Sequence, residues 1–176
     1  QNITGLWILQ RLMSEWKTRG EEQSYDTLIP QAAEATIASI IPVDDALFMN
    51  PVNMENALMD YCRQHDLPVP QNKAEMVKCV LQSLAFKYKQ AVEKLNRCLP
   101  SPIRQLNIIG GGSQNKLLNQ LTADTLGIPV YAGPVEATAI GNILTQAMAK
   151  GEISDLHELR EIVRHSITPQ VYHPKK

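Results

Sequence analysis

Residues 106–119 read Leu-Asn-Ile-Ile-Gly-Gly-Gly-Ser-Gln-Asn-Lys-Leu-Leu-Asn, and this stretch decides how the C-terminal half of the chain folds. The apolar run 106–109 has the length and β-branched content of a buried strand. Three glycines follow, and Ser113 is expected to cap a helix whose apolar face begins at Leu117 and Leu118. The sequence therefore predicts a strand, a tight glycine turn and a helix.

The turn consists of Gly110, Gly111 and Gly112, and it permits a ligand to lie directly on the backbone because glycine has no side chain. The N–H groups of the following helical turn and the positive end of the helix dipole would face that ligand, which suits a phosphate. A single glycine would suffice for a turn that only joins two elements. Three in a row favour a nucleotide or phosphate site, while a βα turn that binds nothing stays open as the alternative.

Two well-known phosphate loops do not match. A Rossmann loop requires a third glycine at its sixth position and an acidic residue about 20 positions later. Here the sixth position is Asn115, and the second predicted strand, 128–131, is followed by no acid before Glu136. A P-loop requires Gly-Lys-Ser/Thr, a tripeptide that this sequence lacks. The sequence therefore argues against NAD binding and P-loop chemistry.

Composition and charge narrow the class of partner. The 176 residues carry a net charge of −1 with acids and bases interspersed, so neither nucleic acid nor an anionic membrane is an expected partner. Apolar runs are only a few residues long and no signal-peptide pattern is present, so we expect a cytoplasmic protein without a membrane span. The chain begins with Gln1 and enters a helical pattern at once, which we interpret as a piece of a longer protein.

Cysteines and histidines do not form a metal-binding pattern. Cys62, Cys79 and Cys98 are too few and too scattered for a disulfide scaffold or a zinc site. Cys62 and Cys79 lie on successive predicted helices, so a bridge between them is geometrically conceivable, but free thiols are expected in a reducing cytoplasm. No metal ligand is predicted. The histidines are expected on the surface: His65, His157, His165 and His173.

Helical periodicity covers most of the remaining sequence, and the fold class is α/β. The predicted helices span residues 6–20, 25–37, 54–65, 73–97, 113–126, 137–151 and 155–165. The strands at 106–109 and 128–131 form a parallel pair with a right-handed crossover. Because so few short strands make a poor sheet, further strands are expected upstream of Gln1. The tail from Thr168 is expected to be frayed, since it contains prolines and ends in two lysines.

Adjacent acids, Asp44 and Asp45, lie in a loop bracketed by Pro42 and Pro51. Adjacent acids in such a loop are more often formers of Asx turns than a catalytic carboxylate pair. We therefore assign them no chemistry.

Three segments in succession carry a family resemblance: Gly-Gly-Gly-Ser-Gln-Asn at 110–115, Leu-Gly-Ile-Pro-Val at 126–130, and Pro-Val-Glu-Ala-Thr-Ala-Ile-Gly-Asn at 134–142. Together they resemble the C-terminal domain of the FGGY carbohydrate kinases, which belong to the actin-like ATPase group with its ribonuclease H-like fold. The resemblance runs over nearly the whole chain. It implies a truncated C-terminal nucleotide-binding lobe at residues 1–167, followed by a tail at 168–176.

The opening segment 2–10 and the loop 44–51 narrow the resemblance to one subfamily. That subfamily uses ATP and Mg²⁺ to convert L-rhamnulose into L-rhamnulose 1-phosphate. A kinase of L-fuculose or of another deoxyketose is the alternative within the family, and a non-catalytic nucleotide-binding or assembly module is the alternative of another class. The family places its catalytic Asp upstream of this segment, so the chain alone is expected to be inactive without its N-terminal lobe.

The resemblance also assigns roles to single residues. The nucleotide would be held by Gln10, Gly110, Gly111, Gly112 and Asn115. Gly111 would lie on the phosphates and Asn115 would hydrogen-bond the adenosine, while Gln10 would contact ATP from the first helix. Asn2 would reach toward the sugar, about 12 Å from Gln10 if both are helical. No catalytic residue and no metal ligand is assigned within this chain.

Overall fold

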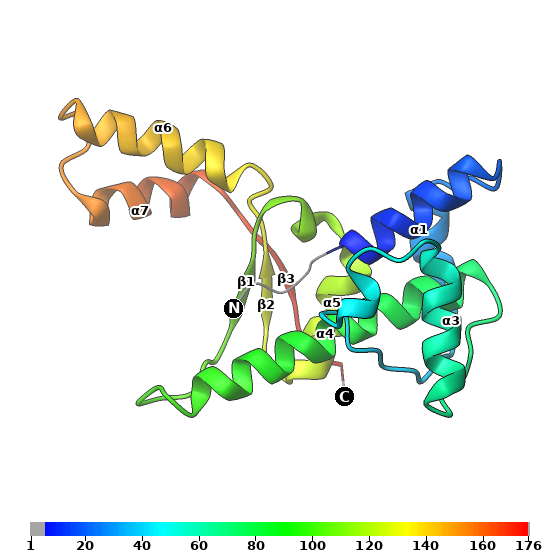
Figure 1. Ribbon diagram of the computed structural model, residues 1–176. Coiled ribbons are helices and arrows are strands. Elements are labelled where there is room, and N and C mark those ends of the chain that lie inside the picture. Colours follow the sequence, from blue (N-terminus) through cyan, green and yellow to red (C-terminus); the bar gives the residue numbers. More distant parts are fainter. Residues whose placement is uncertain (1–5, 176) are drawn as a thin grey trace. The chain divides into compact units, whose positions relative to one another are not determined.

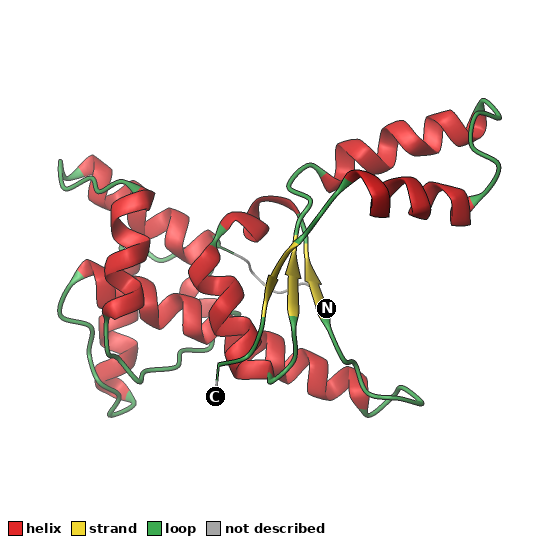
Figure 2. Ribbon diagram, turned by 180° about the vertical axis from the view of Figure 1, so that it is seen from behind, coloured by secondary structure: helices red, strands yellow, loops and turns green. Residues whose placement is uncertain are grey.

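The computed structural model describes residues 6–175, which divide into two compact units on either side of the boundary between Pro102 and Ile103. Figures 1 and 2 show the chain from opposite sides. Each unit is described by itself below. The first unit is helical, and the second contains the sheet and the glycine loop.

The helices of the first unit follow the predicted order. They are α1 (Trp7–Thr18), α2 (Tyr25–Glu34), the 3-10 turn η1 (Ala46–Phe48), α3 (Met54–Gln64) and α4 (Lys73–Asn96). α4 packs against α2 and α1, and α1 also packs against α3. The predicted helices at 6–20, 54–65 and 73–97 are confirmed, whereas α2 ends earlier than residue 37 because Ala35 adopts an extended conformation.

Periodic apolar side chains build the core of this unit. The fully buried residues of α1 are Ile8, Leu9, Leu12 and Trp16. In α4 the buried positions all lie between Met76 and Ala85, whereas Leu95 near its end is exposed. The fully buried side chains of α4 therefore all lie in its first half.

Polar side chains fix where these helices begin. Ser24, Asn53 and Asn72 each precede a helix, and each accepts a hydrogen bond from the backbone N–H three residues later. Asp45 accepts from Leu47 N at 2.9 Å and so forms the expected Asx-type turn before η1. Asp44 instead pairs with Lys87 at 2.6 Å. That ion pair holds the pKa of the Asp44 carboxyl below its usual value.

The second unit contains all three strands of the described residues. Its elements are β1 (Leu106–Ile108), the 3-10 turn η2 (Gly110–Gln114), α5 (Lys116–Leu126), β2 (Val130–Ala132), α6 (Ala137–Ala149), α7 (Leu156–Ser166) and β3 (Gln170–Tyr172). β1 and β2 are parallel, which confirms the predicted pair, and Leu106 lies opposite Val130. α5 packs against β2 and β3.

The expectation of a frayed tail was wrong. Residues 170–172 form β3, which pairs antiparallel with β2 so that the sheet is mixed, with the order β1-β2-β3. Tyr172 lies opposite Val130 and packs with it, Ala123 and Ala132 in the core of the unit. The prolines that flank the strand had favoured a frayed tail. In addition, a strand of three residues is too short to show a periodicity, and its partner lies far away in the sequence.

The helices α6 and α7 pack on each other and run side by side in both views (Figures 1 and 2). Neither contributes a fully buried residue, although α6 is rich in alanine, isoleucine and leucine. Ile143 and Leu156 are at least half exposed.

The three cysteines are free, as the sequence predicted. Cys62 and Cys79 are buried, while Cys98 is exposed. The hydrogen bond with Cys62 and the burial of the side chain raise the pKa of Cys79, so this group is a neutral thiol at physiological pH. The four histidines are exposed, also as predicted.

Candidate functional site

The glycine loop differs in one respect from the predicted strand, turn and capped helix. Residues 110–114 form the short 3-10 helix η2, and Ser113 lies inside it rather than at the start of α5. The N-cap of α5 is Asn115, whose Oδ1 accepts a hydrogen bond from Leu118 N at 2.9 Å. Ser113 Oγ instead donates to Gly110 O at 2.6 Å and closes the 3-10 turn. The prediction that Ser113 caps the helix was therefore wrong.

The three glycines serve different purposes. Gly110 has a φ of +72°, in the left-handed region that other residues rarely adopt, and its N–H donates to Pro134 O at 3.0 Å. A Cβ on Gly112 would make ordinary contact with Ile108 at 3.7 Å. A Cβ on Gly111 would meet no described atom within 4 Å. The fold thus requires glycine at position 110, whereas at 111 the missing side chain leaves open space.

The backbone around Gly111 offers a hydrogen-bond donor to that space. In a 3-10 helix the third residue donates its N–H to the carbonyl of the N-cap, so in η2 the N–H of Gly112 bonds to the carbonyl of Ile109. Because Gly110 N is bonded to Pro134 O, the N–H of Gly111 is the donor that has no carbonyl acceptor within η2. No acidic residue occurs between 106 and 119. A loop with an N–H donor, open space and no negative side chain suits an anionic ligand.

The sequence interpretation missed one polar residue of this site. Asn119 lies on α5 one turn after Asn115, and its side chain is fully buried. Its Nδ2 donates to Ser113 O at 2.8 Å and so ties the helix to the glycine loop. The only signal in the sequence was the spacing of four residues from Asn115, which places both side chains near one face of the helix.

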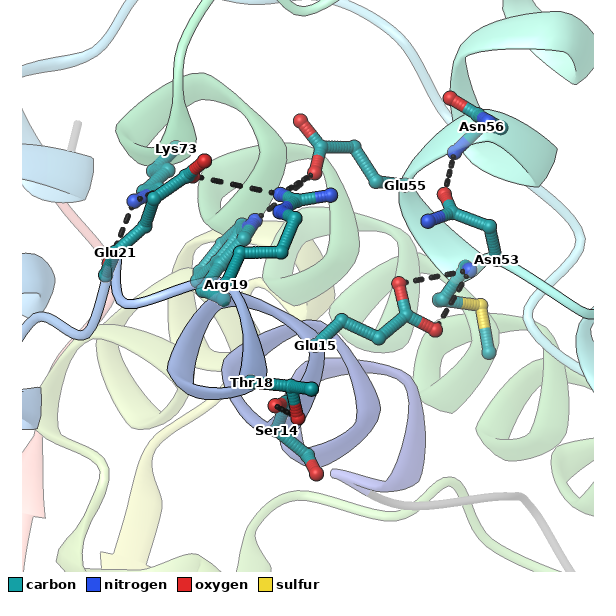
Figure 3. Close-up of polar contacts among 11 residues, drawn as sticks. Ser14, Glu15, Thr18, Arg19, Glu21, Asn53, Glu55, Asn56 and Lys73 are labelled. Atoms are coloured by element: carbon teal, nitrogen blue, oxygen red, sulfur yellow. Dashed lines mark hydrogen bonds and ion pairs between the residues drawn. The ribbon is translucent and has the colours of Figure 1, made fainter.

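A second polar region lies in the first unit (Figure 3). It surrounds a depression with a volume of about 310 Å³, lined by Arg11, Ser14, Glu15, Thr18, Arg19, Val52 and Asn53. The two carboxylate oxygens of Glu15 accept from Met54 N at 2.9 and 3.0 Å, and one of them also accepts from Arg11 Nε at 3.1 Å. Glu15 therefore satisfies the first N–H of α3, where a negative charge is favourable.

The cations of this region all face carboxylates. Arg19 pairs with Glu55 and Glu21, and Lys73 pairs with Glu21 at 3.2 Å (Figure 3). The hydrogen bond with Glu55 raises the pKa of Arg19, and the hydrogen bond with Lys73 lowers the pKa of Glu21. Trp16 Nε1 also donates to Glu55, at 3.1 Å. Because its charges compensate one another, we interpret this region as a structural cluster that joins α1, α3 and the start of α4.

Four of the predicted site residues lie close together in the second unit. Gly110, Gly111, Gly112 and Asn115 follow one another in η2 and at the start of α5. Gln10 is exposed on α1 in the first unit, and Asn2 lies outside the described residues.

Two further properties concern residues 6–175. No group of three or more His, Cys, Asp or Glu side chains lies close enough to hold a metal ion. The glycine loop has no carboxylate of its own for Mg²⁺, so the residues present do not form a magnesium site. None of the described helices is long and apolar enough to span a membrane.

Comparison with known proteins identifies the class to which this fold and loop belong. Residues 1–150 match the model of the C-terminal domain of the FGGY family of carbohydrate kinases, and the chain belongs to this family. The C-terminal domain of the family has the actin-like fold.

Individual relatives point to one member of the family. The chain is 45% identical to the rhamnulokinase of Bacteroides thetaiotaomicron, 46% identical to that of Pectobacterium atrosepticum and 39% identical to that of Bacillus subtilis. In each case the similarity covers 99% of this chain but only 35–36% of the relative. The chain thus spans about a third of the length of these rhamnulokinases.

Proposed function

We propose that this chain is the nucleotide-binding C-terminal part of an ATP-dependent kinase that phosphorylates L-rhamnulose to L-rhamnulose 1-phosphate. The similarity to rhamnulokinases over 99% of the chain supports this substrate. The share of the relatives that is covered supports a longer protein, whose N-terminal part would supply the catalytic base and most sugar contacts. We assign the cytoplasm as its compartment.

The observation that carries the nucleotide role is the open space at Gly111. A glycine that the fold does not need, next to a backbone N–H donor and in a segment (106–119) without acidic residues, is accounted for by a ligand whose phosphates lie on the backbone. The N–H group of Gly111 would donate to a phosphate oxygen. Because this donor belongs to the backbone of a short turn, it is held in place before the nucleotide binds.

The remaining roles extend this proposal. Asn115 would lie beside the adenosine, and its Oδ1 caps α5. Gln10 would contact ATP from α1, and Asn2 would contact the sugar. The magnesium ion would arrive with ATP, since no group of three or more acidic, histidine or cysteine side chains that could hold a metal lies among residues 6–175.

The test uses the longer protein to which we assign the chain. Initial rates of ATP-dependent phosphorylation are measured with L-rhamnulose and with L-fuculose at equal concentrations. A higher kcat/KM for L-rhamnulose is expected, and a preference for L-fuculose would move the protein to another branch of the family. Absence of turnover with either sugar, together with tight ADP binding, would instead favour a non-catalytic nucleotide-binding module.

The same assay on residues 1–176 alone tests whether catalysis requires the N-terminal part of the longer protein. We expect no sugar-dependent ATP turnover from this segment, because the family places its catalytic base upstream of it. Turnover by the isolated segment would overturn that part of the proposal.

A further inference from the structure

Asn119 is a buried amide whose hydrogen bonds are only half satisfied. Its side chain is 0% exposed on α5. Nδ2 donates to Ser113 O at 2.8 Å, whereas Oδ1 has no hydrogen-bond partner among the described residues. A buried carbonyl oxygen without a partner costs free energy, which a leucine of similar size at this position would not incur. The bond to Ser113 is thus the favourable contact that the amide makes with the loop.

That bond is one of several that define the conformation of the loop. Ser113 accepts from Asn119 through its carbonyl and donates through its hydroxyl to Gly110 O at 2.6 Å. Asn115 N donates to Gly112 O at 3.2 Å, and Asn119 N donates to Asn115 O at 3.0 Å. The glycine turn is therefore fastened to the first turn of α5 by backbone bonds at one point and by the Asn119 amide at another.

The position of the Asn119–Ser113 hydrogen bond in the loop determines which backbone groups it holds in place. Ser113 follows Gly111 and Gly112, and the N–H of Gly111 has no acceptor within η2. The hydroxyl of Ser113 bonds to Gly110 O, and this carbonyl lies in the same peptide plane as the N–H of Gly111. By fixing the position of Ser113, the Asn119 amide therefore acts on the direction of the Gly111 N–H. Without the Asn119 bond the 3-10 turn would still form, but the direction of its backbone N–H groups would be less restricted.

We infer that Asn119 is a positioning residue that holds the glycine loop in the conformation that binds the nucleotide phosphates. It acts through Ser113 and does not touch the nucleotide itself. The inference rests on the proposed function, because it presumes that the phosphates lie on Gly111 and Gly112.

The experiment compares two buried residues of the same helix in the longer kinase. Thr122 is also 0% exposed and donates one hydrogen bond, but its Oγ1 bonds to Leu118 O within α5 at 2.7 Å and not to the loop. Asn119→Leu and Thr122→Val therefore each remove one buried hydrogen bond, and only the first releases the loop. We measure KM for ATP, KM for the sugar and kcat.

For Asn119→Leu we expect KM for ATP to rise by about tenfold while KM for the sugar stays unchanged. For Thr122→Val we expect both KM values to stay within about twofold of the wild type, since its hydrogen bond is worth little away from the loop. Equal effects of the two variants on KM for ATP would overturn the inference, because a general loss of stability would then account for both.

A variant of unchanged size keeps the test decisive if the leucine does not fold. Asn119→Asp replaces the donor by a carboxylate facing the Ser113 carbonyl, and burial raises the pKa of such a carboxyl. When protonated, it regains a donor, so the ratio of its KM for ATP to that of the wild type is expected to fall as the pH is lowered from 8 to about 6. A ratio that does not depend on pH would contradict the role of the donated hydrogen bond.

Gly111→Val separates the inference from the proposed function. If this variant raises KM for ATP while Asn119→Leu does not, the loop binds the nucleotide but Asn119 does not position it. If neither variant changes KM for ATP, the assignment of the loop to the nucleotide fails as well.

Discussion

The polar cluster of the first unit and the glycine loop of the second present opposite kinds of polar surface. The cluster is densely charged, yet Arg19, Glu21, Glu55 and Lys73 compensate one another and Glu15 caps α3. The loop has no charged side chain between 106 and 115, yet the N–H of Gly111 has no acceptor within η2. Charge density by itself therefore does not separate a structural cluster from a candidate ligand site, for which an available backbone donor is a separate criterion.

The two regions also differ in the role of their asparagine side chains. In the first unit the side chains of Asn53 and Asn72 each cap a helix. In the second unit Asn115 caps α5 three residues after the last glycine, and Asn119 donates to the carbonyl of Ser113 in the loop. The same residue type thus serves local structure in one region and orients a candidate binding loop in the other.

The largest expected effect concerns the strand that supports the loop-bearing unit. Tyr172→Ala should lower the free energy of unfolding of this unit by about 3 kcal/mol, because a large buried side chain is lost from the small core. Hydrogen exchange followed by mass spectrometry should show faster exchange in 106–132. Exchange in α4 of the first unit serves as the reference.

Tyr172→Phe is the matched control for this change. The hydroxyl of Tyr172 is buried without a hydrogen-bond partner among the described residues, so its removal should leave stability unchanged or raise it. A destabilisation by the phenylalanine as large as that by the alanine would show that the hydroxyl, and not the packed ring, matters.

The next effect concerns the open space at Gly111. Gly111→Val should weaken ADP binding to the longer kinase by tenfold or more, roughly 1.4 kcal/mol, because the side chain would occupy the place of the phosphates. The melting temperature should change little, since a Cβ there meets no described atom within 4 Å. Calorimetric titration and a thermal scan measure the two quantities.

Glycine 110 provides the contrast within the loop. Gly110→Ala should lower stability by about 1 kcal/mol or more, since φ is +72° there and a side chain strains the backbone. If Gly111→Val destabilises the fold as much as Gly110→Ala, the space at Gly111 does not exist as described and the nucleotide assignment loses its support.

A smaller effect is expected in the charged cluster. Glu15→Ala removes the carboxylate that accepts from Met54 N and should cost about 1 kcal/mol of stability, as the loss of other helix caps does. It should leave ADP affinity unchanged if the cluster is structural. Ser14 lines the same depression without capping α3, so Ser14→Ala should leave both stability and ADP affinity unchanged. Chemical denaturation and calorimetry test both, and weaker ADP binding by Glu15→Ala would contradict the structural role.

The smallest effect is a pH dependence of stability in the same cluster. The ion pair with Lys73 lowers the pKa of Glu21 in the folded state, so its contribution is present above the unfolded value of 4.5 and is lost as the pH falls through the folded value. Glu21→Gln should therefore flatten the loss of stability below about pH 4.5. Denaturation at pH 3.5 to 7 measures this, with Glu22→Gln, which contacts Lys17, as the control. An identical pH profile for Glu21→Gln and the wild type would rule out the expected role.

Local patterns were sufficient for most elements and for the general position of the candidate site. The apolar repeat of α1, the long helix α4 and the parallel pair β1 and β2 were all predicted, because each depends on neighbours a few residues apart. The hydrogen bonds within the glycine loop could not be predicted in this way. Either Ser113 or Asn115 could cap α5, and only the hydrogen bonds formed in the folded chain show that Asn115 does so.

By itself, the sequence determined the helices, the parallel strand pair, the glycine turn and the membership of the FGGY carbohydrate kinases, since each is carried by residue types at fixed spacing. Only the tertiary structure decided that 170–172 complete a mixed sheet, that Gly111 faces open space while Gly110 is required by the backbone, and that Asn119 holds the loop. These outcomes depend on contacts between distant residues and on competition among neighbouring hydrogen-bond donors, which composition and periodicity do not record.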